Sequence, residues 1–186
     1  MQENSLGIHI RHSDKGITRG GGKLSVYHCV YMNIYQTSLK LSSHTPFIHL
    51  VIPLSDFFSY VKAFVESGDG SVFVATDSSL VINAIKSEWP TKILSHLVYQ
   101  SGTILSHNDT ATFELGGSSS HHRTNVEALT DILALSKCTY LVHGNSALLE
   151  SAFYLNPLLI ERSINLEHND QDAEAKYAKI LKMIKS

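Results

Sequence analysis

Residues 71–78 read Ser-Val-Phe-Val-Ala-Thr-Asp-Ser, and this stretch decides the fold class. Its first six residues form an unbroken run rich in β-branched and aromatic side chains, which predicts a buried strand. Asp77 and Ser78 are residue types that start helices, and the segment up to Pro90 then repeats its apolar residues at helical spacing. These residues are Leu80, Val81, Ala84 and Ile85. A strand that turns directly into an amphipathic helix is the repeating unit of an α/β fold.

The same alternation continues on both sides of this stretch. Further strands are predicted at Leu6–Ile10, Lys92–Leu97, Thr139–His143 and Pro157–Ile160, and Phe47–Ile52 is also compatible with extended structure. Helices are predicted from Leu54 to the turn at Gly68, from Thr124 to Leu135, from Ser146 to Leu155 and from Asp170 to Lys185. Residues 98–122, rich in Ser, Gly, Thr and His, are predicted to form a long loop. The order predicts a Rossmann-like parallel sheet flanked by helices, in a single α/β domain that spans residues 1–186.

The composition argues against several classes of partner. The chain of 186 residues has a formal net charge of −2, so no overall field attracts nucleic acid or a membrane surface, and an anion site must be built locally. No apolar run approaches the roughly 18 residues of a spanning helix. His121 and His122 are adjacent and do not face the same way, so a metal site is not expected. Cys29 and Cys138 could pair in an oxidising compartment, which leaves the redox environment open.

The first candidate site follows the strand Leu6–Ile10. In parallel sheets, ligands bind outside the carboxyl ends of the strands. The loop there contains Arg11, His12, Asp14 and Lys15. An arginine can hold a phosphate through two parallel hydrogen bonds, and Asp14 could fix the geometry of Arg11 or Lys15. The alternative is a solvated charged loop without a ligand.

Two further candidates follow the strands that end at Thr76 and His143. Asp77 could bind a sugar hydroxyl or could cap the following helix. Gly144, Asn145 and Ser146 stand where a strand turns into a helix, and free backbone N–H groups at such a helix start suit a pyrophosphate. A plain capping turn explains the same three residues.

A fourth candidate is Asp131, a carboxylate inside an otherwise apolar stretch. It stands four residues after Glu127, so both lie on one face of the predicted helix. A carboxylate in such a setting is costly unless it is paired. Its partner could be the amino and imino groups of a guanine base, or alternatively Arg123 or a backbone amide.

Taken in order, three segments resemble the donor-binding domain of α1,6-fucosyltransferases and the related nodulation fucosyltransferase. They are Gly7–Lys15 (GIHIRHSDK), Val72–Ser78 (VFVATDS) and Glu127–Val142 with the residues up to Ser146. The resemblance covers about Leu6 to Pro157. It implies the carboxyl-terminal, Rossmann-like half of a GT-B enzyme that binds GDP-fucose without an obligatory metal or other cofactor.

The resemblance also implies roles for individual residues. Arg11 would bind the β-phosphate and stabilise the departing GDP, His9 and Asp131 would contact the guanosine, and Ser146 would lie near the phosphates. Many α1,6-enzymes have a second arginine where this chain has His12. Arg19 stands at the aligned position of a glutamate proposed as the acceptor base, so no base is assigned. The amino-terminal domain of a GT-B pair is not visible in this sequence.

Three functions follow as hypotheses. The first is a fucosyltransferase-like enzyme that transfers fucose from GDP-fucose to a glycan hydroxyl with inversion. The second is a non-catalytic or truncated module that binds a sugar nucleotide or a glycan, and the third is a phosphate-binding hydrolase. The compartment stays open between the Golgi lumen, for a piece of an anchored eukaryotic enzyme, and the cytoplasm.

Overall fold

The computed structural model describes residues 4–11, 52–68, 70–100 and 118–167, together with Ala175, Ala178–Ile180 and Lys182. In these residues one parallel sheet forms the centre of the fold, with the strand order β3-β2-β1-β4-β5. The strands are β1 (Ser5–Ile10), β2 (Ser71–Thr76), β3 (Leu97–Val98), β4 (Tyr140–His143) and β5 (Ser163–Asn165). The helices are α2 (Leu54–Ser67), α3 (Ser79–Glu88), α4 (Thr91–Leu94), α5 (Ser118–Lys137) and α6 (Ala147–Leu155), with a 3₁₀ helix η2 (Pro157–Arg162).

The chain reverses its direction of winding between β1 and β4. It builds outward from β1 to β2 and β3, returns along α5, and then adds β4 and β5 on the other side of β1. The predicted α/β class and the Rossmann-like parallel sheet are therefore confirmed. In sheets of this kind the reversal creates a topological switch point, where ligands bind outside the carboxyl ends of the strands.

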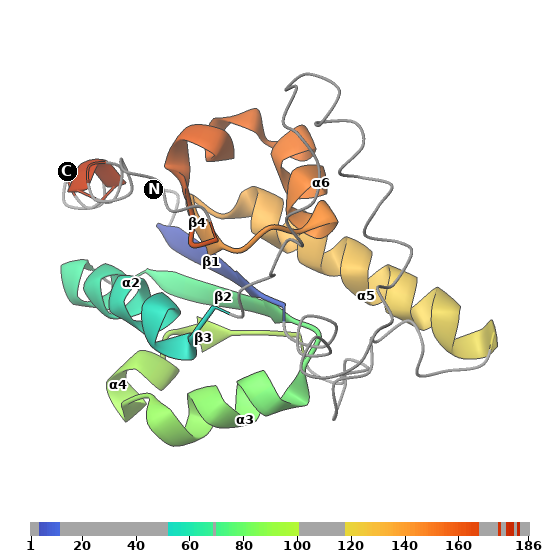
Figure 1. Ribbon diagram of the computed structural model, residues 1–186, viewed down its shortest axis with the longest axis horizontal. Coiled ribbons are helices and arrows are strands. Elements are labelled where there is room, and N and C mark those ends of the chain that lie inside the picture. The colour runs from blue at the N-terminus through green and yellow to red at the C-terminus, as the bar shows by residue number, and fades with distance from the viewer. Residues whose placement is uncertain are drawn as a thin grey trace, which may run out of the picture.

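Helices cover both faces of the sheet (Figure 1). The helices α2, α3 and α4 lie on one face, and α5 and α6 lie on the other. Successive strand side chains point to opposite faces, and in β1 Leu6, Ile8 and Ile10 join the core under α2. Gly7 and His9 therefore belong to the face under α5. A Cβ atom on Gly7 would stand 2.5 Å from Cδ2 of Leu141 and 2.9 Å from Cδ2 of Leu135, so α5 packs closely on β1.

The helix between β1 and β2 follows the predicted pattern. In α2, Phe57, Val61, Phe64 and Val65 are buried at helical spacing, and Tyr60 on the same stripe is half-buried. The helix predicted before Pro90 is confirmed as α3, whose buried residues are Val81, Ile82 and Ile85, while Leu80 is 47% exposed.

Two predicted strands are wrong in their positions. Residues 91–94 form the single helical turn α4 after Pro90, and the strand is reduced to Leu97–Val98. Pro157 opens a 3₁₀ helix, where its fixed φ angle and missing N–H are tolerated, and the last strand begins only at Ser163.

The long helix α5 begins at Ser118, six residues before the predicted start near Thr124. The predicted loop 98–122 is therefore too long at both ends, because Val98 belongs to β3 and residues 118–122 are helical. Residues 47–51 and most of the predicted helix 170–185 lie outside the described residues. The described residues between 175 and 182 are helical, and Ile180 is buried in the core under α2.

Candidate functional site

Three candidate residues follow the carboxyl ends of three neighbouring strands and form one row along that edge of the sheet. Ile10 is paired with Thr76, and His9 is paired with His143. Arg11 and Asp77 are the next residues after the first pair, and Asn145 stands two residues after His143, as Arg11 stands two after His9. Since neighbouring strands lie about 4.8 Å apart, the register places Arg11 between Asp77 and Asn145.

The turn from β4 into α6 stands beside Arg11. Ser146 is the N-cap of α6, and its Oγ accepts a hydrogen bond of 3.2 Å from the backbone N–H of Leu148. The predicted capping turn is thus confirmed. A pyrophosphate role for the remaining N–H groups at this helix start stays a prediction.

The end of β5 fixes this turn, through residues that the sequence analysis did not single out. The Nδ2 group of Asn165 donates to Oδ1 of Asn145 at 2.7 Å, and the N–H of Leu166 donates to the carbonyl of His143 at 2.7 Å. A Cβ atom on Gly144 would stand 2.5 Å from Oε1 of Glu167, so this carboxylate packs against the backbone of the turn. A strand predicted at its true position would have brought Asn165 and Glu167 to the same edge.

His9 lies beneath this edge, next to His143, and the two side chains are 6% and 5% exposed. His143 Nδ1 stands 2.9 Å from the carbonyl oxygen of Gly144. Because a carbonyl only accepts, Nδ1 carries the proton. The ring also meets Phe153 of α6 edge-on, with 5.5 Å between the ring centroids. The structure therefore places His9 in the layer that supports the edge.

Asp131 faces the sheet at the level of His9. Leu135, one turn later on α5, packs beside Gly7. Four residues of an α-helix rise about 6 Å, and two strand residues span a similar distance of about 6.6 Å. Since α5 runs antiparallel to β1, Asp131 lies at the level of His9, nearer the carboxyl edge than Leu135. Figure 1 shows the first turns of α5 extending beyond the end of β1.

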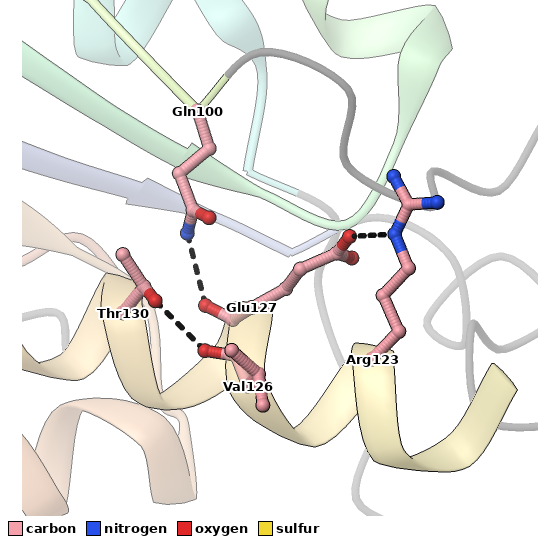
Figure 2. Close-up of polar contacts among 5 residues, drawn as sticks. All are labelled: Gln100, Arg123, Val126, Glu127 and Thr130. Carbon is pink, nitrogen blue, oxygen red and sulfur yellow. Dashed lines mark hydrogen bonds and ion pairs between the residues drawn. The ribbon is translucent and has the colours of Figure 1, made fainter. Parts of the chain in front are cut away.

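The partner of Asp131 is Gln100, two residues after β3. Its Nε2 group donates to Oδ1 of Asp131 at 2.5 Å and to the backbone carbonyl of Glu127 at 2.9 Å. The Glu127 side chain instead forms an ion pair with Arg123, with 2.9 Å between Oε1 and Nε (Figure 2). Glu127 and Asp131 share one helix face as predicted, and the predicted alternative partner Arg123 pairs with Glu127.

The pKa of the Asp131 carboxyl is raised above its ordinary value. Burial raises the pKa of Asp131 to about 6, the hydrogen bond from Gln100 acts in the opposite direction, and the negative charge of Glu127 raises it further. A carboxyl with such a pKa changes charge near neutrality. It can therefore accept hydrogen bonds from a ligand above about pH 6 and can donate one below that pH.

The remaining predicted residues are placed as follows. Ser78, not Asp77, occupies the N-cap position of α3, and Thr76 Oγ1 accepts a 3.3 Å hydrogen bond from the backbone N–H of Ser78. His12, Asp14 and Lys15 lie outside the described residues. The structure thus brings Arg11, Asp77, Asn145 and Ser146 to one edge, with His9 beneath it and Asp131 on the covering helix.

Comparisons with known proteins give one similar structure. Neither the known protein families nor the curated proteins include a match to this chain. Among solved structures, the chain is similar to NodZ, an α-1,6-fucosyltransferase co-crystallized with GDP, with 17% sequence identity and a TM-score of 0.39. The similarity covers 88% of this chain and 38% of that chain. It is a distant likeness of fold to part of a fucosyltransferase, and no residue role follows from it.

Two other groups of residues bear on the chemistry. Within the described ranges, His, Cys, Asp and Glu side chains form no group of three that could hold a metal ion. Cys138 is a buried free thiol, and burial raises its pKa to about 12, while Cys29 lies outside the described residues.

None of the helices in the described part of the chain is long and apolar enough to cross a bilayer.

Proposed function

We propose that this chain is a GDP-sugar-binding domain, and that its function is to transfer fucose from GDP-fucose to a glycan hydroxyl with inversion. The observation that carries the proposal is the row formed by Arg11, Asp77 and Asn145 beside the capped start of α6. The three sequence segments that resemble fucosyltransferases are those that supply this edge and the helix above it. Residues far apart in sequence thus meet where a nucleotide would bind in such a sheet.

The diphosphate would lie between Arg11 and the start of α6. A guanidinium forms charge-assisted, paired hydrogen bonds with phosphate oxygens. The N-terminus of a helix adds a partial positive charge and backbone donors. Together they would compensate the charge of a dianionic leaving group. In other enzymes a metal ion supplies this compensation.

The base would be recognised by Asp131. Guanine presents two neighbouring donors, the N1–H and the 2-amino group, and an ionised carboxylate accepts from both. Adenine presents an acceptor at N1 and uracil has no 2-amino group, so neither matches the carboxylate in this way. Asp131 therefore favours a guanine nucleotide.

Transfer requires one bond to form and one to break. The acceptor oxygen attacks the anomeric carbon from the face opposite the nucleotide, and the bond from that carbon to the β-phosphate oxygen breaks. Arg11 would stabilise the negative charge that develops on this oxygen, and GDP leaves with both electrons of the bond. The hydroxyl proton passes to a base that is not assigned in this chain.

Isothermal titration calorimetry with GDP and GDP-fucose, against UDP and ADP, tests the donor assignment. We expect saturable binding of the two guanine nucleotides and weaker or no binding of the other two. A folded chain that shows no preference for guanine nucleotides contradicts the proposal.

A second candidate is a module that binds the sugar nucleotide without transferring the sugar. The sequence favours it at one position, because Arg19 stands where the similar enzymes have a proposed base. Mass spectrometry of GDP-fucose incubated with the chain and with glycan acceptors separates the two candidates. Release of GDP with a fucosylated product supports the transferase, whereas tight binding with unchanged GDP-fucose supports the module.

A further inference from the structure

The side chain of Gln100 joins two elements that are remote in sequence. It starts from the segment after β3 and reaches the middle of α5, where it contacts residues 27 and 31 positions later in the chain. Figure 2 shows the amide nitrogen directed at the Glu127 carbonyl. This one side chain therefore links the carboxyl end of the edge strand to the helix that carries Asp131.

The orientation of the Gln100 amide is fixed by chemistry. A backbone carbonyl can only accept, so the NH₂ end of the amide must face Glu127. The same nitrogen has a second hydrogen, and Oδ1 of Asp131 receives it at 2.5 Å. Both donors are then used on α5. An ionised carboxylate has two oxygens with about four acceptor sites, and the Gln100 amide uses one of those of Asp131.

We infer that Gln100 is the positioning residue of the base-recognising carboxylate: it holds Asp131 in place and favours its ionised form, so that guanine can donate to it. This inference rests on the proposed function. A donor that faces a carboxylate stabilises the charged form over the protonated one, since a protonated oxygen accepts more weakly. The direction of the Gln100 contribution to the pKa of Asp131 agrees, because this hydrogen bond lowers it while burial and Glu127 raise it.

Other charged and titratable groups belong to α5 and to the sheet face and edge that it covers. On α5 itself they are Glu127 and its ion-pair partner Arg123. From the sheet, His9 of β1 and His143 of β4 belong to the same face, and Arg11 and Asp77 follow the ends of β1 and β2. Because several ionisable groups belong to this side of the sheet, the titration must be read at Asp131 itself.

The experiment therefore follows the Asp131 carboxyl directly. Protein labelled with ¹³C at aspartate carboxyls is titrated by NMR as the wild type and as Gln100→Met, which keeps the side-chain volume and removes both donors. Asp131→Asn identifies the resonance. Thr130→Ala is the matched control, because Thr130 is next to Asp131 in sequence but its exposed hydroxyl donates to the Val126 carbonyl.

We expect the midpoint of Asp131 to move to higher pH in Gln100→Met and to stay in place in Thr130→Ala. An unmoved midpoint in a folded Gln100→Met variant overturns the inference, whatever the variant does with nucleotides. Should Gln100→Met fail to fold, Gln100→Ala is titrated in the same way.

GDP affinity, measured across the same pH range, tests whether Gln100 supports guanine binding through Asp131. We expect Gln100→Met to weaken GDP binding roughly tenfold near pH 6, and by less at pH 8, where Asp131 is ionised even without the donor. An equal loss at both pH values points to a merely structural role and contradicts the inference. A wild-type chain that binds no guanine nucleotide at any pH overturns the proposed function and the base-recognising role with it, even if the midpoint of Asp131 moves.

Discussion

His9 and His143 are directly paired across β1 and β4, and both side chains are buried on the sheet face under α5 and α6. Equal steps along the two strands lead from this pair to Arg11 and Asn145. The register of the buried histidines therefore aligns the exposed end of the switch point. A cation and the start of a helix lie side by side there because the parallel pairing of residues 6–9 with 140–143 fixes the two strands relative to each other.

The first prediction concerns Arg11. Replacing Arg11 with alanine should weaken GDP binding by at least ~1.5 kcal/mol, because a charge-assisted hydrogen bond to phosphate is lost. The GDP affinity of Arg11→Lys should lie between those of the wild type and Arg11→Ala, since lysine keeps the charge but not the paired donors. Calorimetry with GDP measures both variants.

Arg162→Ala is the control for Arg11. Arg162 ends η2, which leads into β5 from the amino edge of the sheet. Its loss should leave GDP affinity unchanged. Equal effects of the two substitutions would show that the net charge of the protein, and not the carboxyl edge, attracts the nucleotide.

The second prediction compares two serines at helix starts. Ser146 caps α6 through its side chain, whereas Ser78 occupies the N-cap position of α3 without a side-chain capping bond. Ser146→Ala should lower the free energy of unfolding by about 1 kcal/mol. The Ser78 hydroxyl is buried and has no hydrogen-bond partner in the described structure, so Ser78→Ala should be neutral or slightly stabilising. Urea denaturation measures both.

The same Ser146 variant separates capping from ligand binding. A serine that only caps should cost stability and leave the GDP affinity of the folded protein intact. A serine that also faces the phosphates should lose GDP affinity in Ser146→Ala beyond the loss caused by unfolding. Calorimetry well below the unfolding temperature distinguishes the two outcomes.

The sequence predicted elements whose signals are local. The run 71–76 is a strand because its β-branched and aromatic residues suit a buried pleated surface, and α6 begins where Ser146 can cap it. Pro157 carried the opposite signal, since proline suits a helical first turn, and this signal should have outweighed the apolar residues after it.

The missed features depend on tertiary structure. Leu97–Val98 is too short for any periodicity to show, and it is a strand because β2 offers a free edge. The first turns of α5 are rich in serine and histidine and carry no apolar stripe, so their helical start was not predicted. Gln100 and Asp131 are 31 positions apart in sequence, and no local sequence pattern predicts a contact between such distant residues.

The third prediction concerns Gly7, where α5 approaches β1. A Cβ atom there would meet Leu141 at 2.5 Å, Leu135 at 2.9 Å and the Cys138 sulfur at 3.0 Å. Gly7→Ala should therefore destabilise the fold by about 1–3 kcal/mol through overpacking. Gly68→Ala is the matched control, since its Cβ would meet nothing within 4 Å and its φ of 176° is extended. Urea denaturation that ranks the two variants in the reverse order would contradict this packing of α5 on the sheet.

The last prediction is a pH dependence of stability that originates at Asp131. Its pKa is raised from 3.8 to about 6 by burial, opposed by Gln100 and increased by Glu127. Between these two values the native state binds more protons than the unfolded chain, so the contribution of this group to stability falls as pH rises. The contribution is complete below about pH 4, is lost through about pH 6, and stays lost above.

Asp131→Asn should remove this decrease in stability with rising pH. An asparagine carbonyl can still accept from Gln100, so the variant should match the wild type at pH 4 and exceed it at pH 7.5. The difference should reach about 2 kcal/mol, somewhat below the full value of the shift because the carboxyl is partly exposed. Urea denaturation at several pH values measures it. Glu66→Gln, on the exposed face of α2, should not reproduce the gain, because surface carboxylates contribute about 0–1 kcal/mol. A constant difference between Asp131→Asn and wild type at all pH values would instead mean that the substitution changes packing and that the Asp131 carboxyl is not the titrating group.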